Sequence, residues 1–227
     1  MTQRLVSAVG LSMAPAVVES APPRRRGPAV RRPLDFYETA PWQVDALVDY
    51  LPELEGSVWE PCVGDASLLT RLRERRPTLG PFTTNDIDVA KRADYHLDAA
   101  RPDAWRAMGQ ESGRPDWVVT NPAFGRAFDI LQHVVGVARF GVVLTVRVSF
   151  SEPIRKGGRG PWLARHPPAK RITLERCSFT ANGKTDSATT EWLIWANVPL
   201  QPPFLISAFG YKPERSPRSS VSNRHAR

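Results

Sequence analysis

Short apolar runs alternate with amphipathic stretches from residue 35 onward in this 227-residue chain. Residues 38–51 carry apolar side chains at roughly helical spacing, with Thr39 as a candidate cap and Pro41 in the first turn. The runs "GSVWE", "PFTTNDID", "ADYHLDAA", "DWVVT" and "FGVVLTVRVSF" predict five strands, and helical patterns follow the first, third and fourth of them. Two later runs, "RITLERCSFTANG" and "ATTEWLIWANV", predict an antiparallel pair.

This order of elements predicts an α/β fold with a doubly wound, mostly parallel sheet. Strands that alternate with helices form βαβ units, and their crossovers are right-handed. Ligands of such sheets bind outside the carboxyl ends of the strands. Four strand ends are therefore considered together as one candidate site: "EPCVGDA", "NDID", "LDAA" and "NPAF".

The net charge of +8 is concentrated in two tails. Residues 1–33 hold six arginines against one glutamate, and residues 211–227 hold five basic residues against one acid. Such Pro-, Ser- and Arg-rich tails are expected to be disordered, and they suit either phosphate contact or a solubilising role. One globular domain is expected over residues 34–210, with a net charge near −1.

Other residue types narrow the functional class. Cys62 and Cys177 are far apart and form no CxxC, which argues against a disulfide scaffold and favours a reducing, cytoplasmic location. The four histidines show no ligand spacing, so no metal site is predicted. No apolar run is long enough to span a bilayer, and Gly10 and Pro15 interrupt the apolar N-terminus, so neither a membrane partner nor a cleaved signal is predicted.

The first three strand ends suit a nucleoside with a positive charge nearby. Glu60 and Asp65 flank a turn at Gly64 without a phosphate-binding motif, although an ordinary βα turn is the alternative. Asp86 or Asp88 can accept hydrogen bonds from ribose hydroxyls. Asp98 can meet an adenine amino group or cap the next helix. S-adenosylmethionine fits this combination better than NAD or ATP, whose phosphates are anionic.

The blocks "FYETA", "WEPCVGDASLL", "NDID" and "NPAF", in this order, resemble class I methyltransferases that act on the amino group of DNA adenine. The order is similar to that of the gamma-type N6-adenine enzymes, and to compact phage or prophage enzymes in particular. The late block "CSFTANGKTDSATTEWLIW" also resembles their C-terminal hairpin. The resemblance covers roughly residues 35–198, and it is shared in part by protein glutamine and RNA adenine methyltransferases.

The resemblance implies a Rossmann-like class I methyltransferase fold and roles for individual residues. The implied cofactor residues are Phe36, Tyr37 and Thr39 over the methionine end, Glu60, Pro61, Gly64 and Asp65 in the cradle, Asp86 at the ribose and Asp98 at the adenine edge. The implied catalytic block is Asn121, Pro122, Ala123 and Phe124.

The catalytic block suits transfer to an exocyclic amine. The Asn121 amide oxygen and the Pro122 carbonyl can each accept an N–H, which orients the amine and stabilises its growing positive charge. Phe124 can stack on a base flipped out of a duplex. The chain departs from the family at Ala123, where a second proline is usual, and at Ala66, where glycine is common.

A basic segment over residues 153–176 follows the fifth strand and is expected to contact the substrate. The candidate substrate residues are Arg155, Lys156, Arg159, Trp162 and Lys184. The chain has no room for a large target-recognition domain, so short or relaxed sequence specificity is expected.

The leading hypothesis is a DNA adenine N6-methyltransferase. RNA adenine, N4-cytosine and protein glutamine methylation stay open, and the basic tails and segment weigh against the last. A non-catalytic nucleic-acid-binding module is the alternative motivated by Ala123 and Ala66. The missing glycine fingerprint disfavours a dehydrogenase.

Overall fold

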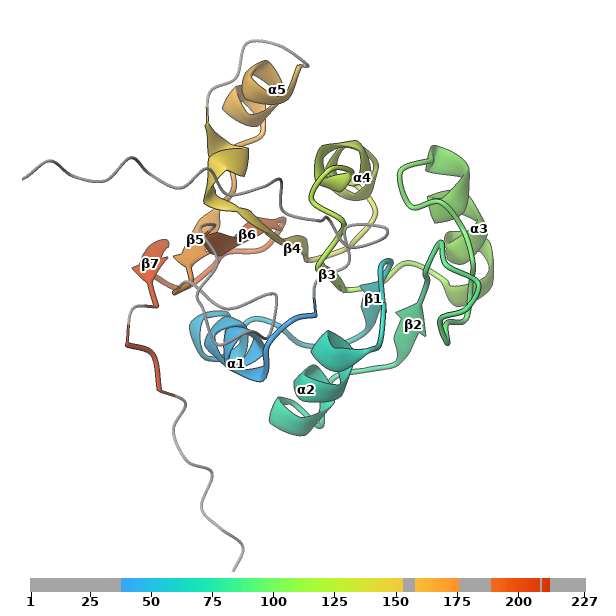
Figure 1. The fold of residues 1–227 in the computed structure, drawn as a ribbon, viewed down its shortest axis with the longest axis horizontal. Helices are drawn as coiled ribbons and strands as arrows, with labels where there is room; N and C mark the ends of the chain where they lie inside the picture. Colours follow the sequence, from blue (N-terminus) through green and yellow to red (C-terminus); the bar gives the residue numbers. More distant parts are fainter. Residues whose placement is uncertain (1–37, 153–157, 176–188, 209, 213–227) are drawn as a thin grey trace, which may run out of the picture. The chain divides into compact units, whose positions relative to one another are not determined.

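The computed structural model describes residues 38–152, 158–175, 189–208 and 210–212. These residues build a seven-stranded sheet in the order β2-β1-β3-β4-β6-β5-β7 (Figure 1). The strands are β1 Val58–Glu60, β2 Phe82–Thr84, β3 Trp117–Thr120, β4 Gly141–Arg147, β5 Lys170–Thr173, β6 Thr190–Ala196 and β7 Leu205–Ser207. Strands β1 to β4 pair in parallel, and β6 runs antiparallel to both β4 and β5. The α/β fold and the late antiparallel pair are thus confirmed.

Helices cover both faces of the sheet (Figure 1). One face packs against α1 (Pro41–Tyr50) and α2 (Ser67–Arg75), and the other against α3 (Pro102–Ser112) and α4 (Ala127–Val134). Strand β3 shows why: Trp117 and Val119 point into the first core and Val118 into the second. A strand buried on both faces reads as a continuous apolar run, as "WVVT" does. After β4 come a short 3₁₀ helix, Val148–Ser151, and α5, Arg159–Arg165.

The expected strand at "ADYHLDAA" is wrong. Only one isolated parallel bridge forms there, between Asn85 and Tyr95. The Asp94 carboxylate accepts hydrogen bonds from the backbone N–H and hydroxyl of Thr84 at 2.8 Å each, which pins the segment beside the end of β2. A side chain therefore supplies part of the pairing that a strand would have made with its backbone.

The cap of α1 also differs from expectation. Ala40 is the residue before the first helical turn, and the Gln43 side chain accepts a hydrogen bond from its backbone N–H at 3.0 Å. Thr39 does not cap the helix, because its hydroxyl is engaged by Asn121 from the loop after β3. The start of α1 is therefore tied directly to the candidate site.

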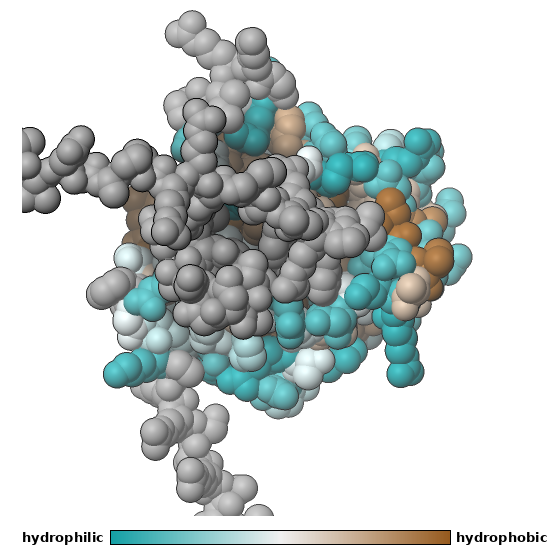
Figure 2. Space-filling view, viewed as in Figure 1, coloured by the Kyte–Doolittle hydropathy of each residue, from teal (hydrophilic) through white to brown (hydrophobic). Residues whose placement is uncertain are grey.

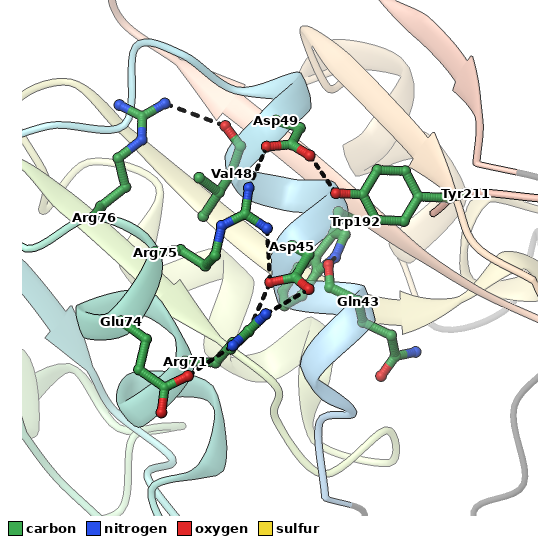
Figure 3. A network of polar contacts seen from close by, with 10 residues as sticks. All are labelled: Gln43, Asp45, Val48, Asp49, Arg71, Glu74, Arg75, Arg76, Trp192 and Tyr211. Atoms are coloured by element: carbon green, nitrogen blue, oxygen red, sulfur yellow. Dashed lines mark hydrogen bonds and ion pairs between the residues drawn. The ribbon is translucent and has the colours of Figure 1, made fainter. Parts of the chain in front are cut away.

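An ion-pair network fastens α1 to α2 (Figure 3). Asp45 is almost fully buried, and its carboxylate accepts two hydrogen bonds from Arg71, at 2.7 and 2.8 Å. It also forms an ion pair with Arg75 at 3.0 Å. Asp49 pairs with Arg75 at 2.6 Å and accepts a hydrogen bond from the hydroxyl of Tyr211, the first residue of the expected C-terminal tail. The network holds α1, and with it Thr39, at the edge of the sheet.

Two basic residues of the segment 153–176 belong to the sheet. Lys170 is 2% exposed and donates to the carbonyl of Tyr50 at 2.8 Å, and its burial lowers the pKa of its ammonium group. Arg171 pairs with the buried carboxylate of Glu191 at 2.8 Å. The expectation that the whole basic segment faces the substrate is therefore wrong for these two residues, because β5 uses them as structural partners.

Candidate functional site

The carboxyl ends of β1 and β2 are joined by Asn85, which is fully buried. Its Nδ2 donates to the carbonyl of Pro61 at 2.9 Å and to that of Leu97 at 3.0 Å, and its Oδ1 accepts from the N–H of Leu97 at 2.9 Å. One side chain thus fixes three loops at the same edge. The motif "NDID" included this residue, but the prediction gave it no role; the signal for it is an amide directly after the strand β2.

Glu60, the last residue of β1, is a buried carboxyl without a full set of partners. It is 1% exposed, and its Oε2 has no hydrogen-bond partner. Burial raises its pKa well above the ordinary value, and the neighbouring carboxylates Asp65 and Asp86 raise it further against a smaller opposing effect of Arg73. A buried acid surrounded by other acids favours a cationic group of a ligand, which would stabilise its ionised form.

We expect Glu60→Gln to stabilise the ligand-free protein while weakening the binding of a cationic ligand. The folded state keeps the Glu60 proton to higher pH than the unfolded chain does, so stability is lost as the pH rises from about 4.5 through the raised pKa. Glutamine removes this pH dependence, because it cannot ionise. Thermal unfolding across neutral pH, with and without S-adenosylmethionine, checks both effects; a variant whose unfolding keeps the wild-type pH dependence would contradict them.

The turn after β1 brings the backbone close to Asp86. Gly64 has a φ of +57°, a conformation that glycine adopts without strain, and its N–H donates to Asp86 Oδ2 at 2.8 Å. Asp86 Oδ1 accepts from the N–H of Asp88 at 2.9 Å. Asp86, rather than Asp88, is therefore the acid that connects the two strand ends. Pro61 is buried in the same turn, and Asp65 is exposed beside it.

Ala66 is the described non-glycine residue with a positive φ, at +63°. The left-handed conformation costs a residue with a Cβ about 1–2 kcal/mol, and glycine avoids this cost. Glycine in turn loses about 0.5–1 kcal/mol of stability, because its unfolded state is more flexible. We expect Ala66→Gly to raise the free energy of unfolding by up to about 1 kcal/mol. Urea unfolding measures it. Gly64→Ala should change stability in the opposite direction, and a loss of stability in Ala66→Gly would contradict the prediction.

Asp98 connects the cofactor side of the edge to the loop after β3. Its carboxylate accepts from the N–H of Ala100 at 3.0 Å and pairs with Arg126 at 3.1 Å. It does not cap α3, because Arg101 is the residue before that helix. Arg126 had no role in the sequence-based prediction, and the structure makes it the ion-pair partner of an expected adenine contact.

The block "NPAF" forms a closed turn between β3 and α4. Asn121 donates from Nδ2 to the hydroxyl of Thr39, itself 3% exposed, at 3.0 Å. Pro122 is buried, and the carbonyl of Ala123 accepts from the N–H of Arg126 at 2.8 Å. This hydrogen bond constrains the turn at the position where the family has its second proline. Phe124 is half-buried, with the guanidinium carbon of Arg147 4.9 Å from its ring centroid.

Cys62 lies between the turn after β1, which carries Glu60 and Asp65, and the block "NPAF". Its side chain lies next to that of Thr120, the residue before Asn121, and burial raises the pKa of its thiol to about 12. The thiol is therefore neutral at physiological pH and serves as a small apolar spacer between the two halves of the edge. The segments "EPCVGDA", "NDID" and "NPAF" after β1, β2 and β3 thus meet at one edge, and "LDAA" joins them there although it follows no strand.

Two solved structures superpose on this chain with TM-scores of 0.50 or more. The type I restriction-modification methyltransferase subunit from Streptococcus thermophilus superposes with a TM-score of 0.54 at 15% identity, over 76% of this chain and 47% of that one. A modification subunit of a putative type I restriction enzyme from Vibrio vulnificus gives 0.50 at 13%, over 71% and 44%. The chain has the class I methyltransferase fold. It spans about half the length of these two subunits.

No protein-family model and no curated protein matches the sequence. At 13–15% identity the structural likeness establishes the methyltransferase fold and nothing further about the chain. The roles of individual residues at its strand ends therefore depend on the geometry described above.

The predicted cofactor and substrate residues are only partly covered by the described ranges. The cofactor residues Phe36 and Tyr37 and the substrate residues Arg155, Lys156 and Lys184 lie outside them. Arg159 places its guanidinium 4.9 Å over the ring of Phe150 and donates to the carbonyl of Ser149 at 3.5 Å. Trp162 stacks on His166 with ring centroids 4.3 Å apart and meets Phe128 and Trp195 edge-on. Trp162 thus packs against its neighbours at the rim of the α4-side core of the methyltransferase fold.

The described ranges contain neither a candidate metal site nor a candidate membrane-spanning helix. No group of three or more His, Cys, Asp or Glu side chains there is placed to hold a metal ion. None of the helices in these ranges combines the length and apolar character needed to cross a bilayer. Figure 2 shows the described surface in this view as mostly hydrophilic, with a small hydrophobic patch near α3.

Proposed function

We propose that this protein is an S-adenosylmethionine-dependent methyltransferase that modifies the exocyclic N6 amine of adenine in DNA. The hydrogen bond from Asn121 Nδ2 to Thr39 carries the proposal, because it sets the amide of a strand-end Asn-Pro turn in one orientation beside an acidic cradle. The two structural neighbours, described as methyltransferase and modification subunits of type I restriction systems, support this class of activity.

The strand ends fit the cationic and nucleoside parts of S-adenosylmethionine. Glu60 offers a buried oxygen without a partner for a positive charge. Asp86 accepts two backbone N–H groups and keeps lone pairs for ribose hydroxyls, because a carboxylate can accept about four hydrogen bonds. Ile87, 53% exposed, supplies apolar surface next to Asp86 for a purine ring. The proposed cofactor residues are Phe36, Tyr37, Thr39, Glu60, Pro61, Gly64, Asp65, Asp86 and Asp98.

The methyl donor and the acceptor meet at Asn121. When bound, S-adenosylmethionine supplies an electrophilic methyl group on a sulfonium, whose sulfur keeps the electron pair of the carbon–sulfur bond. The target amine is a poor nucleophile, because its lone pair is delocalised into the purine. Asn121 Oδ1 and the Pro122 carbonyl accept its two N–H groups, which directs the lone pair away from the ring and stabilises the positive charge that develops on nitrogen. A strong base is not required before attack, and the methylated nitrogen then loses one proton to water to give the neutral product.

The residues around Asn121 determine which two oxygen atoms accept the N–H groups of the target amine. The hydrogen bond from Nδ2 to Thr39 fixes the orientation of the amide and therefore the position of its acceptor atom, Oδ1. The Ala123 carbonyl is used by the turn, so Pro122 provides the second acceptor. Phe124 provides a ring on which a flipped base stacks, worth roughly 1–3 kcal/mol. Arg155, Lys156, Arg159 and Lys184 are proposed to contact the substrate strand, with Trp162 supporting them from its packed position.

Transfer of labelled methyl groups tests the proposal. The full-length protein is incubated with methyl-labelled S-adenosylmethionine and unmethylated DNA, RNA of the same sequence, or a glutamine-containing protein, and products are digested to nucleosides or amino acids. We expect label in N6-methyladenine from DNA, at short or relaxed sites. Label in N4-methylcytosine, in RNA or in glutamine would show that the substrate is not DNA adenine. Cofactor binding without any transfer would favour a non-catalytic module.

A further inference from the structure

Arg147 is a charged residue at the mouth of the site that the sequence-based prediction did not single out. It ends β4, and its Cα pairs with that of Thr190 in β6. The parallel register places Thr120 opposite Leu144, so Arg147 lies three residues beyond this pair, alongside the "NPAF" turn. Side chains alternate along β4, with Val146 in the α4-side core, which puts Arg147 on the same face as Asn121 and Thr39.

The guanidinium of Arg147 lies against the aromatic ring of Phe124. Its carbon lies 4.9 Å from the ring centroid of Phe124, and its Nε is shielded from solvent and has no hydrogen-bond partner. No described residue pairs with it through a hydrogen bond or an ion pair. Among the other half-buried arginines of the described ranges, three pair with carboxylates (Arg71, Arg75 and Arg171) and two donate to backbone carbonyls (Arg76 and Arg159), whereas Arg147 has no such acceptor there.

We propose that Arg147 binds a phosphate of the nucleic-acid strand that presents the target base to Asn121. The contact with Phe124 uses the face of the guanidinium, which leaves the edge that carries its terminal N–H groups for an acceptor. A planar fork of donors matches a phosphate in a two-point contact. The proposal rests on the proposed function, and it assigns the substrate class to a phosphate-bearing strand rather than to a glutamine side chain.

The salt dependence of DNA binding measures this contact directly. Binding of the full-length protein to a labelled oligonucleotide with one adenine is followed at several salt concentrations, with S-adenosylmethionine affinity as a check of folding. We expect Arg147→Ala to weaken binding and to reduce the slope of log K against log salt by about one, with cofactor affinity unchanged. Arg147→Lys should keep the slope, because it retains the charge. Arg106→Ala, which removes an exposed arginine of α3, is the matched control and should leave the slope unchanged.

Uncharged methylphosphonate linkages in the DNA strand identify the phosphate that Arg147 contacts. Replacing single phosphates next to the adenine by methylphosphonate should weaken wild-type binding at one position and have no further effect in Arg147→Ala. This arm needs only the wild-type protein if the variant fails to fold. An unchanged salt slope in Arg147→Ala, or no sensitive phosphate, would overturn the proposal even if N6-methyladenine forms. Phosphate recognition without any methyl transfer would instead overturn the proposed function alone.

Discussion

Replacing Asn121 by alanine is expected to reduce methyl transfer by roughly 10²–10³-fold, because one preorganised polar contact to the developing charge is lost. The same substitution should leave S-adenosylmethionine affinity unchanged, since the acidic cradle belongs to β1 and β2. Asn121 is half-buried, and its side chain contributes to the hydrogen bond with Thr39 rather than to an apolar core. Single-turnover transfer of labelled methyl groups, measured beside cofactor binding, gives both quantities.

Thr39→Val is the matched variant for this prediction. Valine keeps the shape of Thr39 but cannot accept the hydrogen bond from Asn121 Nδ2. The amide is then free to turn, so kcat should fall by less than in Asn121→Ala, with little change in the affinity for DNA. A full wild-type rate in Asn121→Ala would show that the Asn-Pro turn only terminates β3, which is the ordinary structural explanation of such a turn.

Residue patterns predicted the parallel half of the sheet and the meeting of the strand ends for the same reason. Continuous apolar runs such as "WVVT" are typical of a strand that is covered on both faces, and parallel strands bring their carboxyl ends to one edge. The positions of Glu60, Asp86 and Asn121 after strands were therefore enough to place them together, whereas Asp98 reaches the same edge on a segment that forms no strand.

The contacts between these residues were not predictable from spacing. Thr39 resembled a helix cap, because the position before a helix favours a hydroxyl, yet its partner is Asn121, 82 residues further along the chain. Lys170 and Arg171 resembled a solvated basic loop, because charge gives no information about pairing. Their partners, the Tyr50 carbonyl and Glu191, become neighbours only when β5 joins the sheet.

Substituting Asp45 is expected to produce the largest change in stability. Removing one partner of a buried ion pair costs about 3–5 kcal/mol, because the remaining charges lose their compensation. Asp45 is 2% exposed and serves both Arg71 and Arg75 (Figure 3). Since both arginines reach partly to solvent, with side chains 29% and 17% exposed, we expect Asp45→Asn to cost about 3 kcal/mol, at the lower end of this range. Urea unfolding measures the difference in free energy.

Glu74→Gln provides the control for this prediction, because Glu74 pairs with the same Arg71 but is 55% exposed. Exposed pairs contribute roughly 0–1 kcal/mol, so this variant should unfold close to the wild type. Equal losses in the two variants would contradict a special role of Asp45. Because α1 begins two residues after Thr39, loosening α1 from α2 should also reduce methyl transfer in folded Asp45→Asn protein. A variant that is destabilised but keeps the full single-turnover rate would show that Thr39 is positioned by the sheet edge and not by the α1–α2 network.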